Sequence, residues 1–107
     1  MSFDIGKVFE GMLAASGDVL SAEWPGVQAC VKAAYRDELA ALEAIATARL
    51  DGEIDDAEMQ SQLADEKEAL KVALLACKVK GKLAAQKAAN AAIEVLADAV
   101  GAALKLV

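Results

Sequence analysis

Hydrophobic residues recur every three or four positions along three stretches of the chain, and this spacing is typical of amphipathic α-helices. The stretches cover residues 2–20, 25–50 and 55–106. In the first of them, Ser2 stands where its hydroxyl can cap the helix. The pattern therefore predicts an all-α fold with helices over these three ranges.

The break between the second and third stretches combines a helix stop with a helix start. Gly52 follows Leu50, at a place where a helix C-terminus favours a residue with positive φ. Asp55 can cap the next helix by accepting a hydrogen bond from the amide of Glu58, three residues further on. These signals predict a tight turn over residues 51–55 between two antiparallel helices.

The two arms of this hairpin have unequal lengths. At 1.5 Å per residue, residues 25–50 give a helix of about 39 Å and residues 55–106 one of about 78 Å. Pro25 disfavours a helical residue before it, and it lies level with Gly81 when the chain is folded about residue 53. Two arrangements are open: both arms kink there and close into a three- or four-helix bundle, or both continue as an extended, coiled-coil-like hairpin.

The chain contains more apolar residues than the core of a small helical bundle requires. The chain has 107 residues, which is one domain at most, and 57% of them are hydrophobic. A chain of this size leaves roughly a third or more of its surface exposed. We therefore expect an oligomer or a larger protein assembly. The net charge of −6 argues against nucleic acid as a partner.

The end of the third helix is the strongest candidate for such an interface. Between residues 82 and 107 the polar side chains other than Lys87 form a single file. The file consists of Lys82, Gln86, Asn90, Glu94, Asp98 and Lys105. A helix that is apolar around most of its circumference is buried on several sides. The candidate interface residues are Ala84, Ala85, Ala88, Ala92, Leu96, Ala99 and Ala103.

Cys30 and Cys77 lie symmetrically about the predicted turn. Each is roughly 35 Å along its arm, so an antiparallel hairpin places them at nearly the same height and close together. Without an export signal, we expect reduced thiols that behave as small buried hydrophobes. A disulfide is the alternative, and it requires Cα atoms within about 7 Å of each other.

The chain lacks the residue patterns of common catalytic and metal sites. With no histidine, Ser-His and Cys-His pairs are excluded, and two distant cysteines do not make a zinc site. Residues 51–58 resemble the second half of an EF-hand loop, but Arg49 falls at a position where calcium requires an oxygen ligand. We expect no enzyme, no cofactor and no metal site.

The segment Met1–Asp4 lacks the basic region and apolar core of a secretory signal, and no uncharged apolar run is long enough to span a membrane. We expect a cytoplasmic protein, while association with a membrane or with an exported particle stays open.

Two functions are compatible with these features. The first is a non-enzymatic structural or assembly protein, a helical hairpin that packs against copies of itself or a larger complex. The alternative is a membrane-active or channel-forming oligomer in which the polar file from Gln86 to Lys105 lines a water-filled lumen.

Overall fold

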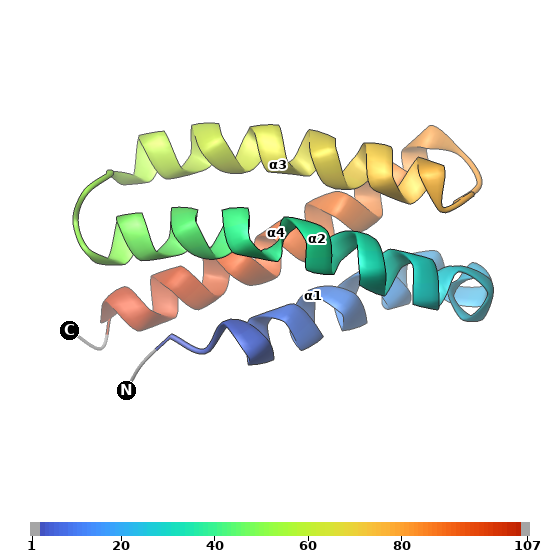
Figure 1. The fold of residues 1–107 in the computed structure, drawn as a ribbon, viewed down its shortest axis with the longest axis horizontal. Helices are drawn as coiled ribbons and strands as arrows, with labels where there is room; N and C mark the ends of the chain where they lie inside the picture. Colours follow the sequence, from blue (N-terminus) through green and yellow to red (C-terminus); the bar gives the residue numbers. More distant parts are fainter. Residues whose placement is uncertain (1–2, 106–107) are drawn as a thin grey trace.

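The computed structural model of the protein describes residues 3–105, and it is built from α-helices joined by short turns (Figure 1). Residues 5–50 are helical throughout: helix α1 spans Ile5–Leu20, the 3₁₀ turn η1 spans Ser21–Glu23, and helix α2 spans Trp24–Leu50. Helix α3 spans Asp56–Ala76 and helix α4 spans Lys82–Lys105. The prediction of an all-α fold is confirmed.

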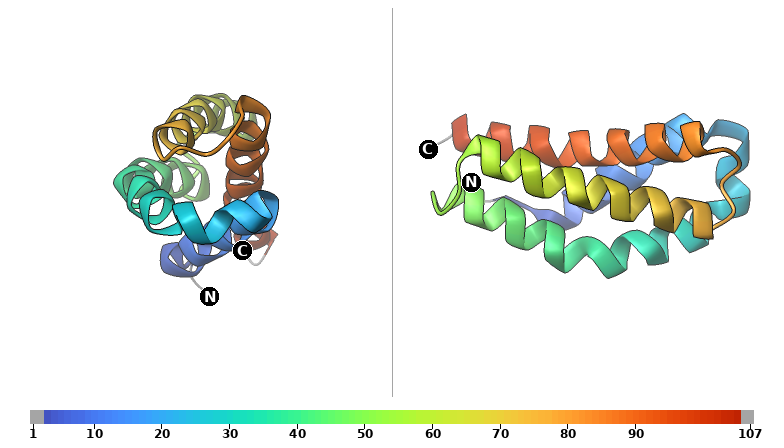
Figure 2. Two further views of the ribbon diagram at one scale, coloured as in Figure 1. Left: turned by 90° about the vertical axis from the view of Figure 1, so that its right-hand side faces the viewer. Right: turned by 90° about the horizontal axis from the view of Figure 1, so that it is seen from above.

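The helices close into a bundle around one core. The chain bends at η1 and again between α3 and α4, so that α1 packs along α4 while α2 packs along α3 (Figures 1 and 2). The molecule measures 40 × 24 × 19 Å, which is about half the length that an unbroken third helix would require. The extended-hairpin alternative is therefore wrong.

The expected helix over residues 55–106 is interrupted by a helix stop that the sequence did not signal. The Val79 N–H donates to the carbonyl of Leu74 at 3.1 Å, and the Lys78 N–H donates to the carbonyl of Leu75 at 3.0 Å. This pair of hydrogen bonds is a Schellman motif, which needs a residue with positive φ. That residue is Lys78, with φ of 68°. The residue pattern predicts only a kink near Gly81, because lysine rarely occupies this conformation.

The connection between α2 and α3 contains a second Schellman motif with the expected glycine. Gly52 has φ of 78°, and the Glu53 N–H donates to the carbonyl of Ala48 at 2.9 Å. Asp55 then caps α3 by accepting a hydrogen bond of 2.8 Å from the Glu58 amide. Both caps agree with the signals in the sequence.

The start of the first helix differs from the expected range of 2–20. Helix α1 begins at Ile5, and its cap is Asp4, whose carboxylate accepts from the Lys7 amide at 3.2 Å. Ser2, the expected cap, lies outside the described residues. An aspartate caps a helix as well as a serine does, so α1 can begin directly after Asp4.

Close packing explains two of the three glycines of α1. A Cβ atom added to Gly17 would lie 2.9 Å from the indole ring of Trp24, and one added to Gly11 would lie 3.0 Å from Val95. These glycines let η1 fold back and α4 approach α1. The core contains residues from all four helices, and its largest fully buried side chains are Tyr35, Met12, Leu42, Leu63, Leu70, Leu74, Ile93 and Leu96.

Candidate functional site

Cys30 on α2 and Cys77 at the end of α3 are joined by a disulfide, with their Cα atoms 5.7 Å apart. The structure therefore brings together the two residues that the sequence placed at one height. The expectation of reduced thiols is wrong. The closely packed arms bring the two Cα atoms well inside the range for bonding. Cys30 is exposed and Cys77 is only 8% exposed.

The α3–α4 connector is held by more than this disulfide. The Lys80 N–H donates to the Glu23 carboxylate at 2.6 Å, which ties the connector to η1. Val79 is 4% exposed and sits in the core.

Four of the seven candidate interface residues lie in the core of this chain. Ala85, Ala88, Ala92 and Leu96 are fully buried against the protein's own helices, so they are not free to contact a second copy. The other three, Ala84, Ala99 and Ala103, are half-buried. The sequence indicated correctly that α4 is enclosed on several sides, but α1 and α3 enclose it.

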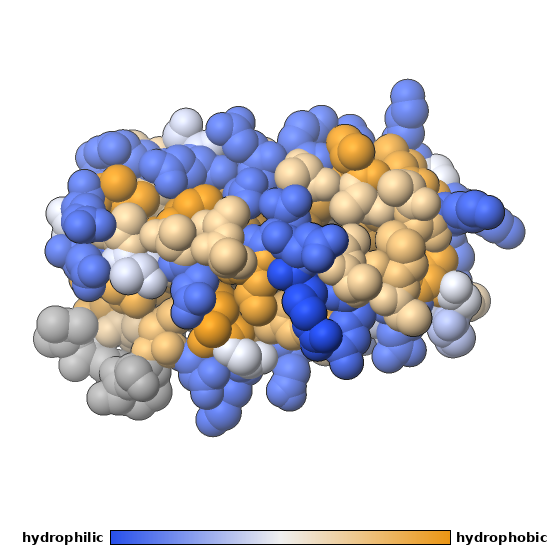
Figure 3. Space-filling view, viewed as in Figure 1, coloured by the Kyte–Doolittle hydropathy of each residue, from blue (hydrophilic) through white to orange (hydrophobic). Residues whose placement is uncertain are grey.

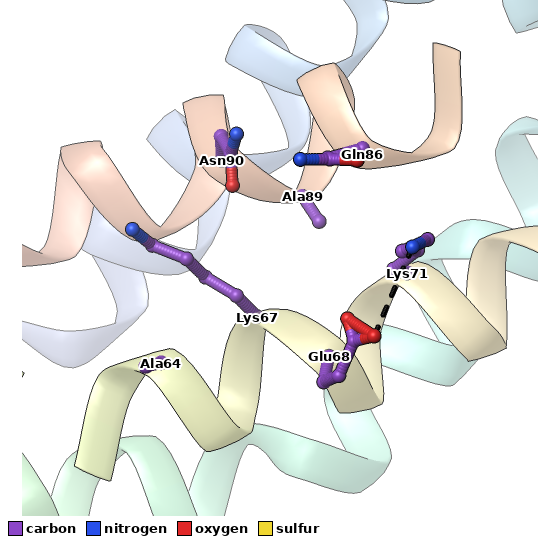
Figure 4. A pocket seen from close by; sticks show the side chains of 7 residues that line it. All are labelled: Ala64, Lys67, Glu68, Lys71, Gln86, Ala89 and Asn90. Carbon is purple, nitrogen blue, oxygen red and sulfur yellow. Dashed lines mark ion pairs between the residues drawn. The ribbon is translucent and has the colours of Figure 1, made fainter. Parts of the chain in front are cut away.

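The polar file of α4 lies on the outside of the bundle, and all six of its members are exposed. Gln86 and Asn90 line an open cleft of about 320 Å³ between α4 and α3 (Figure 4). Lys67 extends from α3 toward α4, and Glu68 lies 3.8 Å from Lys71 (Figure 4). The cleft offers ammonium and amide groups beside one carboxylate.

Glu38 on α2 faces another carboxylate on α3. Glu66 is the neighbour of Glu38, whereas Lys67 on α3 is directed toward α4. Burial raises the pKa of Glu66, and the nearby Glu38 and Asp65 carboxylates raise it further. Oε1 of Glu66 is buried and has no hydrogen-bond partner. This contact is a source of repulsion between α2 and α3 at neutral pH.

Ser16 and Tyr35 form a polar contact at the centre of the bundle. Both are fully buried, and their oxygens lie 2.7 Å apart. Burial raises the pKa of Tyr35, while the hydrogen bond to Ser16 acts in the opposite direction. Because neither side chain reaches the surface, we assign this pair to packing and not to chemistry on a substrate.

The outer surface of α2 and α3 carries an apolar area beside the disulfide, which we call the α2–α3 face. Its residues are Ala29, Cys30 and Ala33 on α2 and Ala69, Val72, Ala73 and Ala76 on α3, all exposed or half-buried. Figure 3 shows apolar colours gathered over these ends of the two helices. Val72 is 62% exposed. The sequence does not reveal this face, because alanine is favoured both in helix cores and on helix surfaces, so its position along the chain does not show whether it is buried.

Within residues 3–105, no three Cys, Asp or Glu side chains are grouped as a metal site would require. Across the same residues, each helix is too short or too polar to cross a membrane. Comparisons of the chain with models of protein families, with curated proteins and with solved structures find no match.

Proposed function

We propose that this protein is a non-enzymatic assembly protein that associates with a second copy of itself through the α2–α3 face. The observation that carries the proposal is the exposure of this face, on which seven apolar residues lie together without an ionisable group. In the chain as a whole, 26% of residues are charged. Apolar areas rimmed by polar residues are typical of protein–protein interfaces.

The charges at the two edges of the face support a second copy as the partner. Arg36 marks the edge of α2 next to α1, because its guanidinium lies 5.7 Å from the centre of the Phe9 ring. Glu68 marks the opposite edge, on the side of α3 that borders the cleft to α4. A twofold axis parallel to the helices would place α2 of one copy over α3 of the other. Arg36 of each copy would then lie near Glu68 of its partner.

The register of the helices fits this pairing. Cys30 and Cys77 are level, so Arg36 on α2 is level with Lys71 on the antiparallel α3. Glu68 lies less than one helical turn from that level. Rotation about an axis along the helices preserves height, and the long side chains of Arg36 and Glu68 can span the remaining offset. Each contact would occur twice in the dimer.

Single substitutions on α3 test the face. Val72→Glu places a charge at the centre of the proposed contact, and we expect it to weaken self-association at least tenfold, because an unpaired charge at an interface costs more than about 1.4 kcal/mol. Ser61→Glu is the matched control, since Ser61 is also exposed on α3 but lies outside the face. Light scattering after size-exclusion chromatography measures both. Equal molar masses for the two variants and the unaltered protein would overturn the assignment of the face.

Charge reversal tests the choice of partner. Arg36→Glu and Glu68→Arg should each weaken the dimer, and the double variant should recover most of the lost affinity, because the pair is restored with opposite polarity. A foreign partner would not carry the compensating change. Failure of the double variant to recover would therefore exclude the twofold pairing, provided that circular dichroism shows all three variants folded.

A further inference from the structure

We propose that Cys30 is a modification site, at which a small external thiol such as glutathione forms a mixed disulfide and releases Cys77 as a free thiol. The disulfide that this reaction consumes joins α2 to the α3–α4 connector. The exchange takes place on the monomer and does not depend on self-association.

The unequal exposure of the two cysteines determines which one is attacked. A thiolate approaches a disulfide sulfur on the side away from the leaving sulfur, so access to the attacked residue controls the rate. Cys30 is exposed on the outer surface of α2, while Cys77 is 8% exposed beside the buried residues Leu74 and Val79. The external thiol therefore reaches Cys30, and Cys77 is the leaving group.

The surroundings of Cys30 leave room for a peptide thiol. Ala29 and Ala33, its neighbours on the exposed surface of α2, have the smallest side chains after glycine. Lys78 and Lys80 follow Cys77 and are both exposed. Cationic neighbours favour the thiolate form of a departing cysteine. They also attract a thiol that carries carboxylates, as glutathione does.

The exchange balances without an added oxidant. The external thiolate forms a bond to the sulfur of Cys30, and the bond between Cys30 and Cys77 breaks. The electron pair of that bond stays on the sulfur of Cys77, which then takes a proton from water. The number of disulfides is unchanged, because the bond within the protein is replaced by one between Cys30 and the small thiol.

Release of Cys77 loosens one end of the bundle. The disulfide closes a loop between residues that are 47 apart in sequence, and loss of a constraint of this length raises the unfolding constant roughly a thousandfold. The connector keeps its hydrogen bond from Lys80 to Glu23 and the burial of Val79. The released state should therefore remain folded, with faster local opening of residues 77–81.

An adduct on Cys30 would also lie on the α2–α3 face. This consequence rests on the proposed function: a bulky, charged group on the face would oppose contact with a second copy. Thiol exchange would then control assembly, with the disulfide form competent to associate and the modified form monomeric.

Peptide mapping tests the exchange directly. The unaltered oxidised protein, at a concentration low enough to be monomeric, is mixed briefly with reduced glutathione, quenched with acid and alkylated with N-ethylmaleimide in denaturant. We expect glutathione on Cys30 and the maleimide on Cys77, in at least about tenfold excess over the reverse pattern. Equal labelling, the reverse pattern or no exchange would overturn the proposal. This result is independent of whether the protein self-associates.

Two single-cysteine variants provide a second test. Cys77→Ala leaves only Cys30, and Cys30→Ala leaves only Cys77. With oxidised glutathione, Cys30 should react at least about tenfold faster than Cys77, and denaturation should remove most of the difference, because access and not intrinsic reactivity separates them. Equal rates in the folded variants would contradict the assignment of Cys30 as the exposed site.

Discussion

Tyr35 on α2 and Ser16 on α1 hydrogen bond to each other at 2.7 Å in the centre of the bundle. Ser16 also donates to the carbonyl of Ala88 on α4 at 3.0 Å, so the Tyr35 hydroxyl is the donor to Ser16. One buried serine thereby links three helices. Buried polar groups are costly unless they are paired, and this arrangement pairs both hydroxyl groups.

The two residues should differ when each hydroxyl is removed. Tyr35→Phe removes one hydrogen bond and leaves Ser16 bonded to Ala88, so we expect a loss of about 0.5–1.5 kcal/mol in the free energy of unfolding. Ser16→Ala leaves the Tyr35 hydroxyl buried without an acceptor, and we expect a loss of about 1–3 kcal/mol. Urea denaturation measures both. A larger loss in Tyr35→Phe than in Ser16→Ala would show that the donor assignment is wrong.

The α3–α4 connector can be stabilised at one residue. Lys78 adopts the left-handed conformation, which costs a residue with a Cβ roughly 1–2 kcal/mol. Lys78→Gly removes this cost at the expense of a more flexible unfolded chain, so we expect a net gain of about 0.5–1 kcal/mol. Lys78→Val should destabilise the protein, because β-branched residues avoid this conformation. Thermal denaturation of both variants checks the order, and a melting temperature for Lys78→Gly below that of the unaltered protein would contradict it.

Two glycines inside helices should respond in opposite directions to the same change. Gly17→Ala forces a Cβ to within 2.9 Å of the Trp24 indole, and we expect a loss of about 1–3 kcal/mol from overpacking. Gly101→Ala is the matched control, because an added Cβ there has open space. It should stabilise α4 by about 0.5–1 kcal/mol. Guanidinium denaturation distinguishes the two, and a stabilised Gly17→Ala would mean that the ring of Trp24 does not pack there.

Burial of Glu66, together with repulsion from Glu38, should make stability depend on pH. The pKa of Glu66 is higher in the folded protein than in the unfolded chain, so the folded state binds the proton more strongly. The resulting stability is fully present below the unfolded pKa, and it is lost as the pH rises through the raised folded pKa. Glu66→Gln should therefore stabilise the protein at pH 7.

The effect of pH itself provides the control for this variant. Near pH 4, where Glu66 is protonated in the folded protein, the melting temperatures of Glu66→Gln and the unaltered protein should converge. Glu53→Gln, at an exposed residue in the turn before α3, is the control for the loss of one surface carboxylate. A gap between Glu66→Gln and the unaltered protein that stays constant from pH 4 to pH 7 would indicate a packing effect instead of a titration.

The sequence predicted helix ends and helix starts correctly where one residue type strongly favours the required backbone conformation. Gly52 and Asp55 are residues that a helix end and a helix start favour, so the turn between α2 and α3 could be located. The break after α3 could not, because Lys78 takes the conformation that glycine usually supplies. The matching positions of Cys30 and Cys77 along the hairpin axis followed from the antiparallel geometry. Whether the two cysteines form a disulfide depends on how closely α2 and α3 approach each other, which the sequence does not show.

The spacing of hydrophobic residues does not show what packs against each apolar helix face. Periodicity shows how much of a helix is buried and not what buries it. It therefore does not distinguish an interface from the protein's own core, which is where Ala88 and Ala92 lie. The α2–α3 face was missed for the same reason. Its residues, such as Ala33 and Ala76, are small enough to fit either inside or outside a bundle.

Sedimentation equilibrium of the unaltered, oxidised protein tests the central claim, which is self-association through the α2–α3 face. One chain has a mass of 11.0 kDa. Over a series of concentrations from low micromolar to several hundred micromolar, we expect the average mass to rise toward that of two chains. A mass that stays at 11.0 kDa throughout this range would contradict it.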